Sequence, residues 1–345
     1  MPEITIPMLS STSKPAIGQV LERAKSLVET GRHSKKEIIP VCVAAHEEPS
    51  IDAVISLMLK QRFREGFEQR LILCTNGADD TTRQKAKRIS ESDSRVEWID
   101  TDEQGKARAI NLMDDLAYGR FDFKVMIRAD ADVLIPDPNS FQKIYDYLDQ
   151  NKGKKGVRVV YKPFLVKPET PEERFVERIC AVKEKVREMV PMLYGRLYGI
   201  RANIPNLRPI PEGLLNDDKF IATKIALDHG IESLGILEDV VVFYKEPRTM
   251  MELIKRANRI KRGNMQMRYE LGTDPHYFGN EVNRNMIFQL SMTELAYLSM
   301  AFALKKIGDT SAILTNDRSN ICRSWDCVRS AKLTYLDFET SLPVS

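Results

Sequence analysis

Short apolar runs alternate with amphipathic stretches through the first part of the chain. The runs predict buried strands at residues 37–45, 70–75, 96–99 and 123–129. Between them, apolar positions at helical spacing predict helices at residues 50–64, 81–91 and 106–118. Strands that alternate with helices in this rhythm predict an α/β fold, with a mostly parallel sheet covered by helices on both faces.

Two further helical patterns lie outside this alternation. Residues 14–30 predict an N-terminal amphipathic helix. Residues 286–304 are rich in Leu, Met and Phe but are interrupted by polar side chains, and they predict a buried or partner-facing helix. Shallow docking of that helix on a membrane stays open. We therefore divide the chain into an N-terminal helical extension (1–36), a main domain (37–270) and a C-terminal helical extension (271–345).

The composition is that of a globular protein. Among the 345 residues, 43% are hydrophobic and 29% are charged, and the net charge of +3 gives no general attraction to nucleic acid. The five cysteines form no C-x-x-C pair, so we expect reduced thiols and a cytoplasmic location. Because the sequence shows neither a signal-peptide pattern nor 18 consecutive uncharged apolar residues, we expect no membrane span.

Two carboxylates follow the fourth apolar run. Asp130 and Asp132 stand at positions i and i+2 of a strand-to-loop bend, so both can turn toward one hard cation such as Mg²⁺ or Mn²⁺. Ligands of parallel sheets bind beyond the carboxyl ends of the strands, where this pair falls. An isolated acidic pair at such a point is more often a solvated turn. An EF-hand is excluded because Phe141 stands where the loop needs a bidentate Glu.

The acidic pair is the fourth of six short motifs spread along the chain. In order, the motifs are Ala44-Ala-His-Glu-Glu48, Thr75-Asn-Gly-Ala-Asp-Asp-Thr-Thr82, Gly105-Lys-Ala-Arg-Ala-Ile-Asn111, Asp130-Ala-Asp132, Leu215-Asn-Asp-Asp-Lys-Phe-Ile-Ala-Thr-Lys224 and Glu246-Pro-Arg-Thr with Arg256-x-x-Arg259-x-x-x-Gly263. Each motif alone is weak. Together and in this order, over residues 39–263, they resemble glycosyltransferase family 2.

The resemblance implies a GT-A fold, which is a Rossmann-like, mostly parallel sheet flanked by helices. It also implies an inverting transfer of one sugar from a nucleotide-sugar donor, with a UDP-sugar favoured and Mg²⁺ or Mn²⁺ as cofactor. Residues 37–165 would form the donor half of the domain and residues 166–270 the acceptor half. Asp130 and Asp132 would hold the metal.

The resemblance also assigns a set of donor-binding residues. Lys106 would bring a compact positive charge to the nucleotide, and Asn76 stands where the family often has an Asp facing the uracil edge. Arg256 and Arg259, at i and i+3, share one helical face and could clamp the donor diphosphate or a phosphorylated acceptor. A solvated basic face is the ordinary alternative. The full donor set is Ala44, Ala45, His46, Glu48, Asn76, Lys106, Asp130, Arg256 and Arg259.

Two adjacent acids carry the implied catalysis. Asp218 matches the family's general base, which takes the proton of the acceptor hydroxyl, and Asp217 would assist it. Without the resemblance, both would be read as first-turn residues that complement a helix dipole. The chain departs from the family where Arg256 replaces a Gln and Ile260 replaces a Trp. This departure argues against a processive polysaccharide synthase and favours a small or specialised acceptor.

Two other functions compete with this one. A sugar-1-phosphate nucleotidyltransferase shares the sheet and the metal-holding acid, but it usually carries a glycine-rich loop that this chain lacks after its first strand. A non-catalytic nucleotide-sugar binder would keep the donor site and show no turnover. Nucleic-acid binding is not expected, because only Tyr269 lies near the basic run. The oligomeric state is left undetermined.

Overall fold

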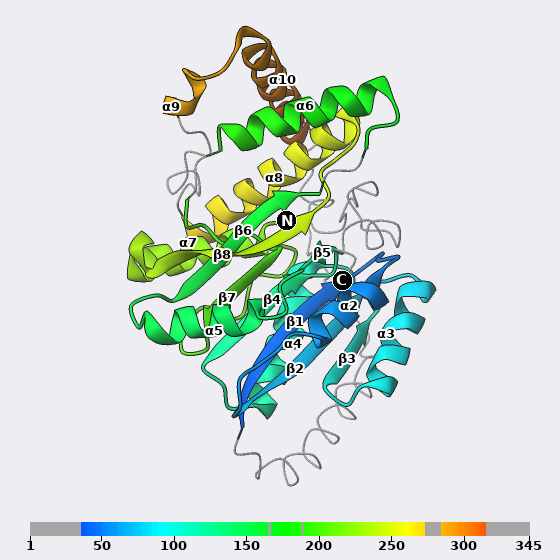
Figure 1. Cartoon of the computed structure of the whole chain (residues 1–345), viewed down its shortest axis with the longest axis vertical. Coiled ribbons are helices and arrows are strands. Elements are labelled where there is room, and N and C mark those ends of the chain that lie inside the picture. Colours follow the sequence, from blue (N-terminus) through cyan, green and yellow to red (C-terminus); the bar gives the residue numbers. More distant parts are fainter. Residues whose placement is uncertain (1–35, 165–166, 188–189, 273–283, 315–345) are drawn as a thin grey trace, which may run out of the picture.

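The structure is a computed structural model, and it describes residues 36–164, 167–187, 190–272 and 284–314 (Figure 1). The predicted helix at 14–30 lies outside the described residues.

One mixed sheet forms the centre of the described chain. Its strands are β1 (Glu37–Ala45), β2 (Phe67–Asn76), β3 (Val96–Thr101), β4 (Val125–Asp130), β5 (Val133–Leu134), β6 (Gly156–Pro163), β7 (Leu197–Arg201) and β8 (Leu234–Tyr244), in the order β3-β2-β1-β4-β7-β6-β8-β5. The four predicted strands are confirmed, and β3, β2, β1 and β4 pair in parallel as expected. Beyond β4, β7 runs antiparallel to both of its neighbours, which the sequence did not predict.

Helices cover both faces of this sheet (Figure 1). They are α2 (Ile51–Leu59), α3 (Asp80–Ser92), α4 (Lys106–Arg120), α5 (Ser140–Gln150), α6 (Pro171–Lys185), α7 (Asp217–His229), α8 (Met250–Leu271), α9 (Arg284–Ile287) and α10 (Met292–Leu314). The three predicted helices between the strands are confirmed, although α2 ends earlier than residue 64. The chain leaves the helix there because Arg62 and Gln61 bond to the segment before α5: the Arg62 N–H donates to the Pro138 carbonyl at 2.6 Å.

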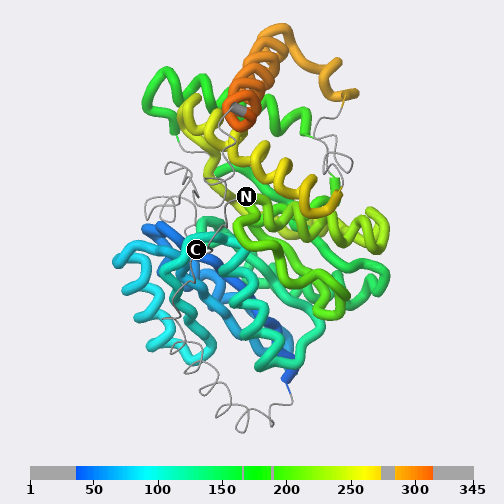
Figure 2. The backbone as a smooth tube through the Cα atoms, turned by 180° about the vertical axis from the view of Figure 1, so that it is seen from behind, coloured from blue at the N-terminus to red at the C-terminus, as the bar shows by residue number. Residues whose placement is uncertain are grey.

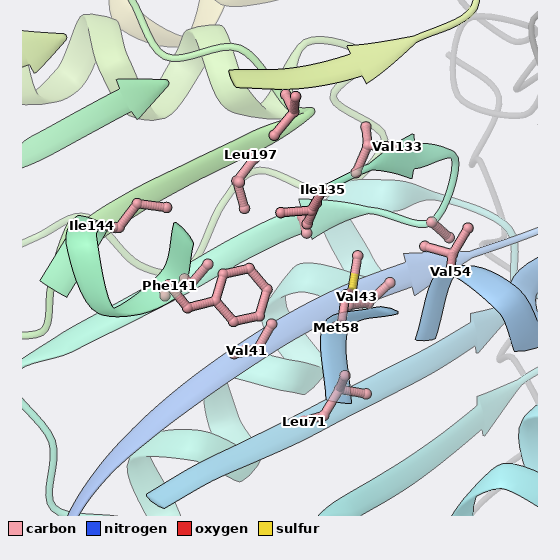
Figure 3. Packing of buried hydrophobic residues seen from close by; sticks show 14 of the residues in the cluster. Val41, Val43, Val54, Met58, Leu71, Val133, Ile135, Phe141, Ile144 and Leu197 are labelled. Atoms are coloured by element: carbon pink, nitrogen blue, oxygen red, sulfur yellow. The ribbon is translucent and has the colours of Figure 1, made fainter. Parts of the chain in front are cut away.

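Two hydrophobic layers hold the sheet between its helices. Successive side chains of a strand point to opposite faces, so Val41 and Val43 of β1 join the layer under α2 and α5, while Cys42 and Ala44 join the layer under α4 and α7. Figure 3 shows the first layer, with Phe141 of α5 lying over β1. All of these strand residues are nearly inaccessible to solvent.

Three helices form a separate layer beyond the sheet edge. Figures 1 and 2 show α6, α8 and α10 stacked at one end of the molecule. At their crossing, α10 approaches α8 so closely that a Cβ on Gly308 would lie 2.6 Å from the Ala257 Cβ.

The predicted helix at 286–304 corresponds to α10, which begins later and is buried on one face only. Leu298 and Leu304 are buried, whereas Met300 and Ile307 are exposed. None of the described helices is both long and apolar enough to cross a membrane.

Candidate active site

Most of the predicted site residues meet at one cavity of about 470 Å³. It lies beyond the carboxyl ends of β1 and β4, where Ala44 and Asp130 are paired across the two strands. The predicted residues that line it are Ala44, Glu48, Lys106, Asp130, Asp132, Asp217, Asp218, Arg256 and Arg259. Side chains from elements far apart in the sequence therefore meet at this cavity.

Lys106 stands at the centre of the acidic side of the cavity. It is the first residue of α4, after Gly105 with its positive φ of 140°. Its Nζ lies 2.6 Å from Asp130 Oδ1 and 3.7 Å from Asp217 Oδ2. Burial opposes its charge, but Asp130, Asp217 and Asp218 raise its pKa well above the usual value. One ammonium group thus bridges the end of β4 and the start of α7.

Asp218 is held by two backbone N–H groups. The Gly195 N–H donates to Oδ2 at 2.5 Å, and the Lys219 N–H donates to Oδ1 at 2.7 Å. Gly195 itself passes close to the acidic cluster, because a Cβ there would lie 2.8 Å from the Lys106 Nζ and 3.3 Å from Asp130 Oδ2. The carboxylate of Asp218 is consequently oriented into the cavity that it shares with Asp130.

Asp217 differs from its neighbour in burial. Its side chain is buried, and burial raises its pKa to about 6, an effect that Lys106 opposes and that Asp218 and Asp130 strengthen. Three carboxylates around a single lysine leave an excess of negative charge on this side of the cavity. Such a side favours a cation.

The opposite side carries the basic helix α8. Arg256 forms an ion pair with Glu246, whose Oε1 also accepts a hydrogen bond from the Tyr244 hydroxyl at 2.6 Å. Burial works against ionisation of Glu246, but Arg256 and Arg196 lower its pKa to about 2. One turn further along α8, Arg259 lines the cavity.

Helix α8 also fixes the segment that carries the two acids. The Asn216 amide, just before α7, donates to the Ile260 carbonyl at 3.1 Å and to Asn264 Oδ1 at 3.2 Å. Gly263 permits this approach, because a Cβ there would lie 2.4 Å from the Asn216 Cγ. The start of α7 is therefore set against the middle of α8.

The comparisons with known proteins agree with this geometry. Residues 37–190 match the family model described as Glycosyl transferase family 2. Over these residues, the sequence is similar to glycosyl transferase family 2. The recognition from six ordered motifs is thereby confirmed, and the protein is a glycosyltransferase.

A solved structure of a glycosyltransferase shares the fold. A mannosyltransferase from Pyrobaculum calidifontis, in complex with GDP-Man and Mn²⁺, is 17% identical over 88% of this chain and 87% of its own, with a TM-score of 0.52. That likeness confirms the expected GT-A fold. A glucosyl-3-phosphoglycerate synthase from Mycobacterium tuberculosis, in complex with Mn²⁺, UDP-glucose and phosphoglyceric acid, is 16% identical over 73% of this chain and 83% of its own, with a TM-score of 0.45. No curated protein matches the sequence.

Three expected donor residues lie beside this glycosyltransferase cavity rather than in its lining. Ala45, His46 and Asn76 are buried, and they are not among the described residues that line the cavity. The His46 Nδ1 lies 3.0 Å from the Asn76 carbonyl oxygen, within hydrogen-bonding distance. The Asn76 amide is buried with no hydrogen-bond partner among the described residues. Its donor and acceptor are thus left unmatched.

Gly195 and Glu246 are site residues whose roles the sequence did not reveal. Gly195 lies between Tyr194 and Arg196, just ahead of the apolar run that becomes β7. Glycine before a short strand is a usable signal of close backbone approach. Glu246 stood inside the sixth motif, but only the fold shows its pairing with Arg256.

Proposed function

We propose that this glycosyltransferase moves one sugar from a nucleotide-sugar donor, with a UDP-sugar favoured, to a hydroxyl of a non-polymer acceptor, inverting the anomeric carbon. One observation carries the proposal. Asp130 and Asp132 at the end of β4, and Asp218 at the start of α7, line the same cavity. A metal-holding pair and a general base are the two groups that such a transfer requires.

The donor set fits a divalent ion that arrives with its nucleotide. Asp130 already faces a positive charge, the Lys106 ammonium at 2.6 Å, and Asp132 lines the same space. The described residues contain no group of three or more His, Cys, Asp or Glu side chains that could hold a metal alone. Mg²⁺ and Mn²⁺ are commonly held by one or two carboxylates plus substrate phosphates. When bound, the ion would supply positive charge to the departing nucleoside diphosphate.

The protein's own groups would prepare the acceptor hydroxyl. Asp218 would accept its proton, since the Gly195 and Lys219 N–H groups hold the carboxylate in one orientation. Lys106 would add positive charge beside the diphosphate. Asp217, with a pKa of about 6, would limit the negative charge near Asp218 below that pH.

The nucleotide base would lie near β1 and β2. Asn76 offers an unmatched donor and acceptor there, which suits the edge of a pyrimidine such as uracil. Ala44, Ala45, His46 and Glu48 at the end of β1 would line its approach. The P. calidifontis mannosyltransferase was solved with GDP-Man and Mn²⁺, which supports a nucleotide sugar with a metal as the donor class.

A release assay tests the proposal against its rivals. The protein is mixed with a panel of nucleotide sugars, candidate acceptors and Mn²⁺, and the released nucleotide is identified. Nucleoside diphosphate supports glycosyl transfer. Pyrophosphate, formed from a sugar phosphate and a nucleoside triphosphate, would instead identify a nucleotidyltransferase. Donor binding without turnover across the panel would identify a non-catalytic binder.

The metal assignment has its own test. We expect Asp132→Ala to abolish the Mn²⁺-dependent part of UDP binding, measured by titration calorimetry with and without Mn²⁺. Exposed Asp102 lies outside the cavity lining, so Asp102→Ala is the matched control and should bind as the wild type does. Equal Mn²⁺ dependence in wild type and Asp132→Ala would remove Asp132 from the metal site.

A further inference from the structure

The wall of the cavity opposite the carboxylates has a composition that the donor does not explain. It is formed by α6, α8 and α10, together with the residues that follow α6. Its positive charge comes from Lys183, Arg187, Arg256, Arg259, Lys261 and Lys305, against the acids Glu184, Glu246 and Asp309. Apolar side chains lie between these charged groups, with Ile179, Leu253, Leu298 and Leu304 among the lining residues.

The positive charge of this wall is only partly neutralised. Arg256 is paired with Glu246, and Arg187 lies 3.3 Å from Glu184 while its guanidinium stacks on the Tyr194 ring at 4.9 Å. Within the described part of the chain, Arg259 has no ion pair, and its Nε is buried without a hydrogen-bond partner. A buried guanidinium donor of this kind gains most from an anionic acceptor such as phosphate.

The donor diphosphate already has partners on the other wall. Asp130, Asp132 and Lys106 line the acidic side, where the metal and the diphosphate belong under the proposed function. A second phosphate site on the helical wall would therefore serve the acceptor. This argument rests on the proposed function.

The apolar part of the wall continues to the protein surface. Leu253 and Leu304 are buried in one cluster with residues of α6, Leu298 is buried in a second such cluster, and each still borders the cavity. Phe302 lines the same cavity but is 47% exposed, so it lies at the rim. Apolar walls with a few convergent polar groups are typical of sites that bind apolar ligand surface. A chain attached to the acceptor could follow this path outward.

We propose that the acceptor is an anionic amphiphile, with a phosphate-bearing headgroup on Arg187 and Arg259 and an aliphatic chain against the apolar residues of α6, α8 and α10. A hydroxyl of the headgroup faces Asp218. The hydroxyl oxygen bonds to the anomeric carbon of the sugar as the bond from that carbon to the nucleoside diphosphate breaks. The hydroxyl proton passes to Asp218, and the nucleoside diphosphate leaves.

Three probes separate the contribution of the phosphate-bearing headgroup to binding from that of the aliphatic chain. Dodecyl phosphate carries both, glycerol 3-phosphate lacks the chain, and dodecyl maltoside lacks the charge. Each is titrated below its micelle concentration into the full-length protein with saturating UDP and Mn²⁺. We expect dodecyl phosphate to bind at least tenfold more tightly than either of the others. Equal binding of glycerol 3-phosphate or of dodecyl maltoside would overturn the amphiphile.

Matched variants locate the site. We expect Arg259→Gln to weaken dodecyl phosphate about tenfold or more, as the loss of a charge-assisted hydrogen bond would do, while Arg268→Gln, exposed on the same helix, has no effect. Phe302→Asn should weaken it several-fold, and Ile313→Asn, also exposed on α10, should not.

The same variants distinguish this proposal from the donor assignment. UDP affinity with Mn²⁺ is measured first, without any probe. If Arg259→Gln lowers that affinity and leaves the probe unaffected, Arg259 serves the donor diphosphate and the amphiphile proposal is wrong. If the wild type fails to bind any nucleoside diphosphate with Mn²⁺, the proposed function itself has failed. The two failures are read from separate titrations.

Discussion

The cavity has two walls: a sheet wall that carries Lys106, Asp130, Asp132, Asp217 and Asp218, and a helical wall formed mainly by α6, α8 and α10. The two walls shift the pKa of a carboxyl group in opposite directions. On the sheet wall, burial and neighbouring acids raise the pKa of Asp217 to about 6. On the helical wall, Arg256 and Arg196 overcome the burial of Glu246 and lower its pKa to about 2. The sheet wall thus carries unsatisfied negative charge, while the helical wall carries surplus positive charge.

This difference in charge suits the two walls to different ligands. The sheet wall suits a metal ion and its diphosphate, because carboxylates there are crowded around one lysine. The helical wall suits an anion and apolar surface, because Arg187, Arg259 and apolar side chains of three helices line it. Changes that alter one wall alone should therefore separate donor binding, acceptor binding and stability.

The largest effect is expected where the sheet wall supplies the base. Asp218→Asn should lower the rate of transfer roughly 10²–10⁴-fold, the usual contribution of general base catalysis. UDP binding with Mn²⁺ should be retained, because the amide keeps the shape of the side chain. Both are measured on purified protein by nucleotide release and calorimetry. Asp228→Asn, at the exposed end of the same helix, is the control. Undiminished transfer by Asp218→Asn would end the base assignment.

The next effect concerns the ion pair beneath the sheet wall. Arg128 of β4 donates to both oxygens of Asp114 in α4, at 2.8 and 2.7 Å, and both side chains are buried. Asp114→Ala would leave the guanidinium buried and unpaired, which destabilises the fold by about 3–5 kcal/mol. Urea unfolding measures the change. The exposed pair of Lys152 and Asp149 is the control, and Asp149→Ala should change stability by less than about 1 kcal/mol.

The sheet wall could be predicted from the sequence for a simple physical reason. Buried parallel strands appear as apolar runs, and their polar successors must collect at one edge of the sheet. Asp130 and Asp132 were found at such a strand end, while their role as metal ligands and the role of Lys106 came from the resemblance carried by the ordered motifs. The antiparallel β7 was not, because an apolar run gives a strand but not the direction of its neighbour. Gly195, which precedes β7, was missed with it.

The helical wall could not be predicted to the same depth. The spacing of Arg256 and Arg259 placed them on one helical face. Nothing in that spacing indicated that Glu246 forms an ion pair with Arg256. The part that α10 plays in the cavity depends on its packing against α8, through the close approach at Gly308. Such contacts join residues about 50 positions apart in the chain, and periodicity reports only on near neighbours.

A smaller effect is expected where the two walls are joined. Gly263→Ala places a Cβ 2.4 Å from the Asn216 Cγ, so α8 or the start of α7 must shift. We expect a loss of about 1–3 kcal/mol in the free energy of unfolding and slower transfer, since Asp218 moves with that segment. Gly119→Ala is the matched helical control, because nothing lies within 4 Å of its Cβ. There the substitution should stabilise the fold by about 0.5–1 kcal/mol. A Gly263→Ala protein as stable and active as the control would show that the walls are not coupled at this contact.

The smallest effect is a difference in pH dependence between the walls. Glu246 has a folded-state pKa of about 2, below its usual value of 4.5, so its contribution is present above pH 4.5 and is lost as the pH falls toward 2. Asp217 has a folded-state pKa of about 6, above its usual 3.8, so the folded state binds its proton more tightly and ionisation destabilises the fold as the pH rises from about 4 to 6.

Glu246→Gln should therefore destabilise the protein by about 1–3 kcal/mol at pH 7, and progressively less toward pH 3. Asp217→Asn should leave stability at pH 4 nearly unchanged and raise it by about 1 kcal/mol at pH 7, because the amide removes the buried charge. Urea unfolding at pH 3, 4, 5, 6 and 7 measures both series. Parallel curves for the two variants would mean that the walls do not differ in charge as described.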